Sequence, residues 1–241
     1  MILFNFKVKL ENKVVHVWLI EAITLPDKLK EFSKTLSKDE LQKASKFRFE
    51  KDRSVFITAR FLLRKLIGNY LNVNPKEIDF DYSEYNKPTY LGNTELDFNV
   101  SHSNNQIIIG FSKKLTIGVD IEKIKNDFDA LDLAKNVFSN EEVNALSTYS
   151  GTSLYRAFYR GWTRKESFIK AVGEGLSYPL KSFSVTIDED EKASFISIES
   201  KQESKQNWQL YSFIPTDGFI AAITTQGKPK RIDYFDANKI L

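Results

Sequence analysis

Residues 117–122 read Ile-Gly-Val-Asp-Ile-Glu, and this alternation of apolar residues with small or acidic ones predicts a β-strand. In a strand, successive side chains point to opposite faces, so Ile117, Val119 and Ile121 share one side. Asp120 and Glu122 therefore lie together on the other side. Two carboxylates at this spacing repel each other unless a cation lies near them. The segment predicts either a cation site or a half-buried strand with a solvated acidic face.

A helical segment at residues 155–172 carries a third candidate carboxylate. Its apolar residues recur at three- and four-residue intervals and predict one buried stripe, formed by Tyr155, Phe158, Tyr159, Trp162, Ile169 and Val172. Glu166 falls within this stripe, and a carboxylate that faces a core must be neutralised, paired or bound to metal. An ion pair with Lys170, four residues later, is the simplest structural explanation. The alternative is a metal site shared with Asp120 and Glu122.

The composition restricts which metal such a site takes. The chain has 241 residues, of which 41% are hydrophobic and 28% are charged, as is typical of a folded globular protein. It contains no cysteine, which excludes disulfides, zinc ribbons, iron–sulfur clusters and thiol nucleophiles. With His16 and His102 as the only histidines, a site made of carboxylates favours Mg²⁺.

The ends and the apolar stretches of the sequence bear on its location. No apolar stretch approaches the ~20 residues of a membrane span, so we expect no membrane partner. Residues 1–10 lack the apolar core and cleavage site of a signal peptide. From these features and the absence of cysteine we expect a cytoplasmic protein.

The net charge of +3 is unevenly distributed along the chain. Between Lys43 and Lys65 there are eight basic and two acidic residues, which give this stretch a charge of +6. A local basic face on a nearly neutral protein fits a compact anionic ligand better than a long polyanion. A solvated helix surface is the simplest explanation, and nucleic-acid binding through this stretch is a further alternative.

The order of the predicted elements indicates an α+β fold in which each half mixes helices with antiparallel strands. Strands are predicted at residues 2–9, 14–20, 78–82, 96–101, 106–111 and 115–122, and then in an antiparallel meander at 183–187, 193–199, 208–214 and 219–224. Residues 112–114 (Ser-Lys-Lys) suit either a joint between two lobes, 1–112 and 113–241, or a hairpin turn.

Capping signals predict where several helices begin and end. Helical spacing follows Pro26, and capping boxes at Ser37 and Ser139 predict the starts of two further helices. Asp52 is the predicted cap of the helix that carries the second half of the basic stretch. Gly173 is predicted to end the helix that contains Glu166.

Several common catalytic motifs are missing from the sequence. There is no phosphate-binding P-loop, no dinucleotide-binding glycine pattern and no Gly-x-Ser-x-Gly elbow. Ser101 and His102 are adjacent on a predicted strand, so they point to opposite faces and do not form a nucleophile–base pair.

The motifs taken together resemble one family, the 4′-phosphopantetheinyl transferases of the larger, surfactin-synthetase-activating type. The matching segments are residues 86–88 (Asn-Lys-Pro), 98–103 (Phe-Asn-Val-Ser-His-Ser), 117–122, 138–142 (Phe-Ser-x-x-Glu), 162–170 (Trp-Thr-x-Lys-Glu-Ser-x-x-Lys) and 175–180 (Gly-Leu-Ser-x-Pro-Leu). The resemblance is strong over residues 86–180 and loose elsewhere. Glu142 stands at a glutamate position of the family, although its capping box suffices to explain it.

The resemblance implies a fold and a set of functional residues. The fold is a pseudo-two-fold pair of similar α+β lobes with coenzyme A in the cleft between them. Asp120, Glu122 and Glu166 match the Mg²⁺ ligands, and Lys170 matches the lysine that faces the pyrophosphate. The other residues implied to contact coenzyme A are Lys87, Ser101 and His102 at the 3′-phosphate and nearby groups, with Lys43 and Arg60 at the nucleotide phosphates.

The implied activity is that of a holo-acyl-carrier-protein synthase. A serine of an apo acyl or peptidyl carrier protein attacks the phosphorus that bears the pantetheine arm of coenzyme A, and 3′,5′-ADP leaves. Glu166 is expected to remove the serine proton, directly or through a water on the metal, while Lys170 offsets charge on the leaving phosphate. We expect a monomer that binds no nucleic acid. The alternatives are a Mg²⁺-dependent phosphodiesterase that uses water, and a basic nucleic-acid-binding module.

Overall fold

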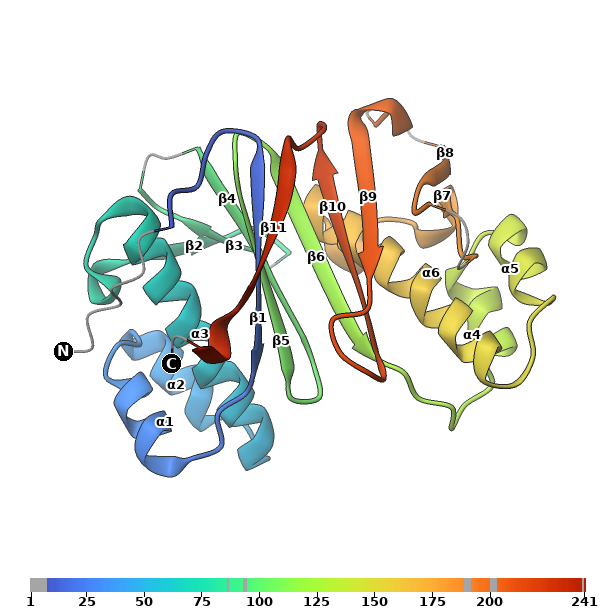
Figure 1. Ribbon diagram of the computed structural model, residues 1–241. Helices are drawn as coiled ribbons and strands as arrows, with labels where there is room; N and C mark the ends of the chain where they lie inside the picture. Colours follow the sequence, from blue (N-terminus) through green and yellow to red (C-terminus); the bar gives the residue numbers. More distant parts are fainter. Residues whose placement is uncertain (1–7, 86, 93–94, 189–191, 200–202, 240) are drawn as a thin grey trace.

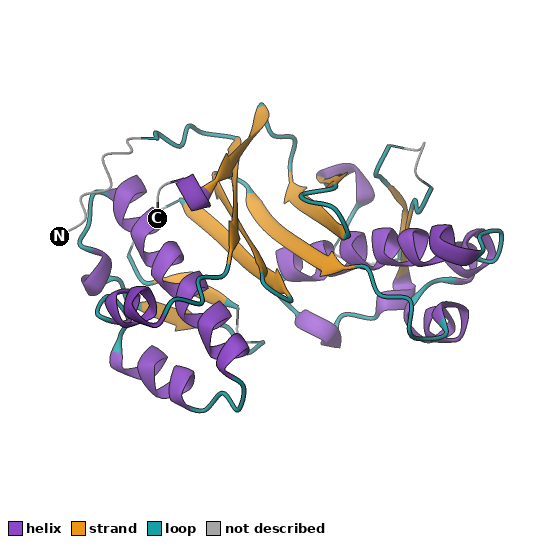
Figure 2. Ribbon diagram, turned by 60° about the horizontal axis from the view of Figure 1, so that its bottom comes forward, coloured by secondary structure: helices purple, strands orange, loops and turns teal. Residues whose placement is uncertain are grey.

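In the computed structural model, two β-sheets face each other in the middle of the molecule and helices cover their outer faces (Figure 1). The structure describes residues 8–85, 87–92, 95–188, 192–199, 203–239 and 241. The view in Figure 2 shows the strands enclosed between helices on either side. This arrangement of four layers confirms the predicted α+β class.

The first sheet and its helices come mostly from the N-terminal half of the chain. Its strands lie in the order β11 (Arg231–Asp236), β1 (Val14–Glu21), β5 (Gln106–Lys113) and β4 (Leu96–Ser103). The helices of this lobe are α1 (Pro26–Ser33), α2 (Lys38–Ser45) and α3 (Glu50–Leu71). Buried leucines of α3 pack against Trp18 and Phe111 of the sheet, which fixes the helix on its outer face.

The second lobe repeats this plan with a three-stranded sheet. Its strands lie in the order β6 (Thr116–Lys123), β10 (Phe219–Gln226) and β9 (Trp208–Phe213). Its helices are α4 (Ala130–Val137), α5 (Asn140–Leu146) and α6 (Gly151–Val172). Both α3 and α6 have 22 residues, and each covers the outer face of its own sheet.

Shorter elements complete the two lobes. Two small sheets pair β2 (Phe80–Tyr82) with β3 (Pro88–Tyr90) and β7 (Phe183–Val185) with β8 (Phe195–Ile198). The 3₁₀ turns are η1 (Pro75–Glu77), η2 (Gly175–Ser177), η3 (Leu180–Ser182), η4 (Lys205–Asn207) and η5 (Ala237–Lys239).

An apolar core joins the two sheets. Val15, Val17 and Ile108 of the first sheet belong to the same buried cluster as Val119 and Ile121 of the second. Strands β5 and β6 follow each other in the chain but belong to different sheets. Residues 112–114 therefore end β5 and lead into the other sheet, and they are not the turn of a hairpin. The boundary between two lobes at this place stays a prediction.

Most local predictions are confirmed, and one cap is wrong. Capping boxes are present at Ser37 and Ser139. Gly173 ends α6 with a φ of 90°, a left-handed conformation that glycine adopts without strain. The helix predicted to start after Asp52 instead begins at Glu50. The strand predicted at residues 2–9 falls largely on residues 1–7, which lie outside the described residues.

Long-range pairing differs from the prediction in the C-terminal part. The four strands predicted as one meander separate, because β7 pairs with β8 while β9 and β10 join β6. The last strand, β11, pairs in parallel with β1 and so adds to the sheet of the first lobe, although residues 113–241 were expected to form the second. Among the described helices, none combines the length and the apolar character needed to cross a bilayer.

Candidate functional site

Strand β6 presents its two carboxylates to helix α6. Ile117, Val119 and Ile121 are fully buried in the core between the sheets, as their alternation predicts. Asp120 points to the other face and is only 2% exposed, while Glu122 is half-buried. The acidic face of the strand is therefore enclosed by the protein, which argues against a merely solvated acidic face.

Helix α6 contacts β6 at Gly118. A Cβ atom at this position would lie 2.0 Å from the carbonyl oxygen of Ser167 and 2.4 Å from the backbone nitrogen of Ala171. No residue other than glycine leaves room for the helix backbone at this distance. This close approach brings Glu166 and Lys170, on either side of the contact, next to the strand.

Lys170 pairs with Asp120. Its Nζ lies 2.6 Å from Asp120 Oδ1 and 2.9 Å from the Oγ of Ser101, which in turn donates to the same carboxylate oxygen at 2.8 Å. Burial opposes the charge of the ammonium group, but the Asp120 carboxylate, reinforced by Glu166 and Glu122, raises the pKa of Lys170. The ion pair between Glu166 and Lys170, one of the two explanations of Glu166, does not occur among the described residues. That simpler explanation of Glu166 is therefore not supported.

Neither of the remaining two carboxylates forms an ion pair within the described residues. Burial, together with the charges of Asp120 and Glu122, raises the pKa of Glu166 to about 7, although Lys170 acts in the opposite direction. Burial and the charge of Asp120 also raise the pKa of Glu122, against a hydrogen bond from Ser103 at 2.7 Å. Among the described residues, Lys170 is the one ammonium group bonded to any of the three carboxylates, and the charge of Lys125 also acts to lower the pKa of Glu122. The carboxylates therefore outnumber the cations of this cluster.

The residues implied to contact coenzyme A lie at different distances from this cluster. Ser101 belongs to it directly. His102, next along β4, is exposed, and desolvation by the surrounding chain together with the Lys170 cation lowers its pKa. Lys87 lies near the C-terminal end of α6, where its Nζ is 3.4 Å from the carbonyl oxygens of Ile117 and Ala171.

The two candidates from the basic stretch occupy different environments. The Nζ of Lys43 is exposed and lies 5.6 Å from the centre of the Phe56 ring. Arg60 is buried, donates to the hydroxyl of Tyr82 at 2.9 Å and lies 3.7 Å from a carboxylate oxygen of Glu40. Lys43 is therefore available to a ligand, whereas Arg60 already supports the packing of α3.

Comparison with known proteins identifies the family. The model of the 4′-phosphopantetheinyl transferase superfamily matches residues 116–224, and that of the N-terminal part of 4′-phosphopantetheinyl transferases matches residues 24–113. The chain is 32% identical to the 4′-phosphopantetheinyl transferase HetI of Nostoc sp. over 88% of both chains. It belongs to the 4′-phosphopantetheinyl transferases.

Further relatives of this transferase include Sfp, from Bacillus subtilis. The identity to that 4′-phosphopantetheinyl transferase is 34%, over 68% of this chain and 71% of Sfp. Among solved structures, the chain is similar to a holo-(acyl-carrier-protein) synthase from Bacillus anthracis, with a TM-score of 0.37 and 23% identity over 47% of this chain and 96% of that one.

The donor atoms of the cluster suit a hard cation such as Mg²⁺. All three carboxylates offer oxygen, the ligand that this ion prefers. The Oδ2 of Asp120 is buried and has no hydrogen-bond partner in the described part of the chain. As the side chains stand, no group of three acidic or histidine residues in the described ranges is arranged to hold an ion. The expected convergence of Asp120, Glu122 and Glu166 thus stays a prediction, which the unpartnered oxygen and the shortage of positive charge support.

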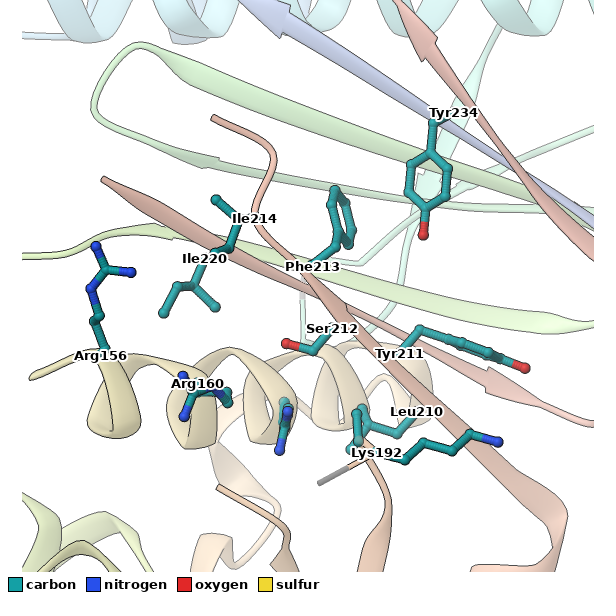
Figure 3. A pocket seen from close by; sticks show the side chains of 12 residues that line it. Arg156, Arg160, Lys192, Leu210, Tyr211, Ser212, Phe213, Ile214, Ile220 and Tyr234 are labelled. Atoms are coloured by element: carbon teal, nitrogen blue, oxygen red, sulfur yellow. The ribbon is translucent and has the colours of Figure 1, made fainter. Parts of the chain in front are cut away.

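A pocket of about 450 Å³ lies apart from this cluster (Figure 3). It opens beside strand β9 and is lined by Arg156 and Arg160 of α6, by Tyr211 and Phe213 of β9 and by Tyr234 of β11, among others. None of the predicted site residues lines it. The carboxylate cluster, and not this pocket, therefore remains the candidate active site of the transferase.

Sequence reasoning missed two groups of residues around the site. Lys165 and Glu142 form a fully buried ion pair of 2.7 Å that fastens α5 to α6, in addition to the predicted capping box of Glu142. On β4, Asp97, Asn99 and Ser103 bond to β6. The polar residues at every second position of residues 97–103 were the available signal for this second group.

Proposed function

We propose that this transferase moves the 4′-phosphopantetheine group of coenzyme A to a serine hydroxyl of an apo acyl or peptidyl carrier protein. Membership of the family supports the reaction. The single observation that supports the location is the contact of β6 with α6, where Lys170 pairs with Asp120 and its charge acts on Glu166 and Glu122. Such an excess of carboxylates over cations suits a divalent ion.

In the proposed reaction the serine oxygen forms a bond to the phosphorus that carries the pantetheine arm. The bond from this phosphorus to the bridging oxygen of the diphosphate breaks, and 3′,5′-ADP leaves with the electron pair. Glu166 accepts the serine proton, since it has neither an ion pair nor a hydrogen bond within the described residues. Lys170 faces the leaving phosphate and stabilises its charge.

Asp120, Glu122 and Glu166 are the residues that would hold Mg²⁺. When bound, this ion supplies positive charge to the oxygens of the diphosphate. The protein contributes a buried strand and a helix held at fixed distance by Gly118, which position these side chains before the substrate arrives.

Basic and polar residues around the cluster are proposed to bind the phosphates of coenzyme A. Lys87, Ser101 and His102 are assigned to the 3′-phosphate and nearby groups, and Lys43 to the nucleotide phosphates. Arg60 is retained as a weaker candidate, because Glu40 and Tyr82 already engage its guanidinium group. Both lobes thus contribute from one chain, which suits a monomer.

Mass spectrometry of a carrier protein tests the proposal. Incubation of an apo carrier with this protein, coenzyme A and Mg²⁺ should increase the carrier mass by one phosphopantetheine group, and omission of the protein is the control. An unchanged mass across a panel of acyl and peptidyl carriers would contradict the proposal. Release of 3′,5′-ADP without any carrier would instead indicate the phosphodiesterase. Steeply salt-dependent binding to nucleic acid would indicate the binding module.

A further inference from the structure

Strand β4 carries polar side chains at alternate positions, and they line the edge of β6. Asp97 Oδ2 accepts a hydrogen bond from the backbone N–H of Ile117 at 2.8 Å, and Asn99 Oδ1 accepts one from Val119 at 2.9 Å. The two strands belong to different sheets, so these side chains take the place of a neighbouring strand. The lobes are thereby joined in one fixed register.

Ser103 continues this row one step further. Its Oγ accepts the backbone N–H of Lys123 at 3.1 Å and donates to Glu122 Oε2 at 2.7 Å. A hydroxyl has one proton to donate, and here the carboxylate receives it. The orientation of this hydroxyl is thus set by the backbone of the same strand that carries Glu122.

Glu122 needs such an anchor more than Asp120 does. Asp120 is nearly fully buried and is held by both Ser101 and Lys170. Glu122 is only half-buried and has a longer side chain, and Ser103 is its one hydrogen-bond partner within the described residues. Without this bond, the Glu122 carboxylate is free to turn toward solvent, away from Asp120 and Glu166.

We propose that Ser103 is a positioning residue that keeps the Glu122 carboxylate on the face of β6 that carries Asp120, where it is available to the divalent ion. This inference rests on the proposed function, because it assigns Glu122 to the metal site. Hydrogen-bonded partners that orient metal-binding carboxylates typically change metal affinity by about 10- to 100-fold when they are removed. A purely structural Ser103 would instead only complete the edge of β6 through the N–H of Lys123.

Binding of Mn²⁺, measured by the electron paramagnetic resonance of the free ion, distinguishes these roles. We expect Ser103→Ala to weaken Mn²⁺ binding by about 10- to 100-fold, while Ser103→Thr, which keeps the hydroxyl, restores it. Ser212→Ala is the matched control, since Ser212 on β9 is also half-buried and donates to a backbone carbonyl oxygen, that of Ala221. This control should bind Mn²⁺ like the unmodified protein.

The thermal unfolding midpoint, measured in parallel without metal, reports any structural role. A Ser103→Ala protein that binds Mn²⁺ as tightly as the unmodified protein would overturn the inference, whatever its midpoint. If Ser103→Ala does not fold, Ser103→Cys, which is close in size but a weak donor, carries the same test. If the variants overturn the inference but the unmodified protein transfers phosphopantetheine and binds Mn²⁺, the proposed function still stands. Absence of both from the unmodified protein would overturn the proposed function as well as this inference.

Discussion

At the scale of single residues, the three carboxylates differ in what balances their charge. Asp120 is bonded to Lys170, whereas Glu166 and Glu122 have raised pKa values, caused first by burial and then by neighbouring carboxylates. An ion pair of Lys170 with Glu166 along the same helix was the alternative to a metal site, but Lys170 bonds to Asp120 of the strand instead. Carboxylates whose charge is not balanced by a bonded protein cation favour a bound metal ion. The dependence of transfer on metal is therefore the property to test.

Replacement of Glu122 or Glu166 should lower the rate of Mg²⁺-dependent transfer. We expect Glu122→Ala and Glu166→Ala each to lower the rate of phosphopantetheine transfer by at least ~100-fold, because each loses a proposed metal ligand. The measurement is carrier mass against time over a series of Mg²⁺ concentrations. Glu141→Ala, at an exposed position of α5, is the control and should keep the full rate. Transfer that stays dependent on Mg²⁺ in both variants would show that the ligands lie elsewhere.

At the scale of elements, the contact between α6 and β6 decides the geometry of the site. A Cβ at Gly118 would meet backbone atoms of α6, which cannot rotate away as a side chain does. We expect Gly118→Ala to destabilise the protein by about 1–3 kcal/mol and to lower transfer, because the helix must move away from the strand. Urea unfolding and the carrier assay measure the two effects.

Gly161 of the same helix provides the comparison. A Cβ there would approach only side-chain atoms of Ile187 and Phe138, at 3.0 Å, and these can shift. Alanine also gains about 1 kcal/mol of helix propensity over glycine, which offsets the crowding. A Gly118→Ala variant as stable and as active as Gly161→Ala would contradict the importance of the close contact.

At the scale of the whole molecule, His16 links the core of the first lobe to the returning strand β11. Its ring is buried, its Nδ1 lies 2.8 Å from the hydroxyl of Tyr70 on α3, and its Nε2 lies 3.6 Å from Asp233 on β11. Burial lowers its pKa from 6.5 to about 4, although the Asp233 carboxylate opposes this. Protonation of this one side chain is therefore coupled to the folding of the lobe.

The unfolded chain binds a proton at His16 near pH 6.5, whereas the folded protein does so only near pH 4. Stability from this group is complete above pH 6.5 and falls as the pH decreases toward 4, by up to about 3 kcal/mol. We expect His16→Gln to flatten this part of the curve of unfolding free energy against pH, measured with urea between pH 4 and 8. An unchanged slope in the variant would contradict the assignment to His16.

Local patterns in the sequence were sufficient to predict elements and the faces of their residues. Alternation along residues 117–122 predicted which side chains of β6 are buried, and Ser37, Ser139 and Gly173 correctly marked helix ends, because these effects act between neighbours in the chain. Asp52 failed as a cap, since Phe49 and Glu50 already start the helix. The motif resemblance led to the family.

Only the tertiary structure decided which elements meet. The parallel pairing of β11 with β1, the row of β4 side chains along β6 and the pairing of Lys170 with Asp120 all join residues far apart in the chain. Their partners are selected by packing of the two lobes, which no local pattern encodes. Sequence thus determined the chemical groups and their faces, and the contact of α6 with β6 at Gly118 determined that Lys170 meets Asp120.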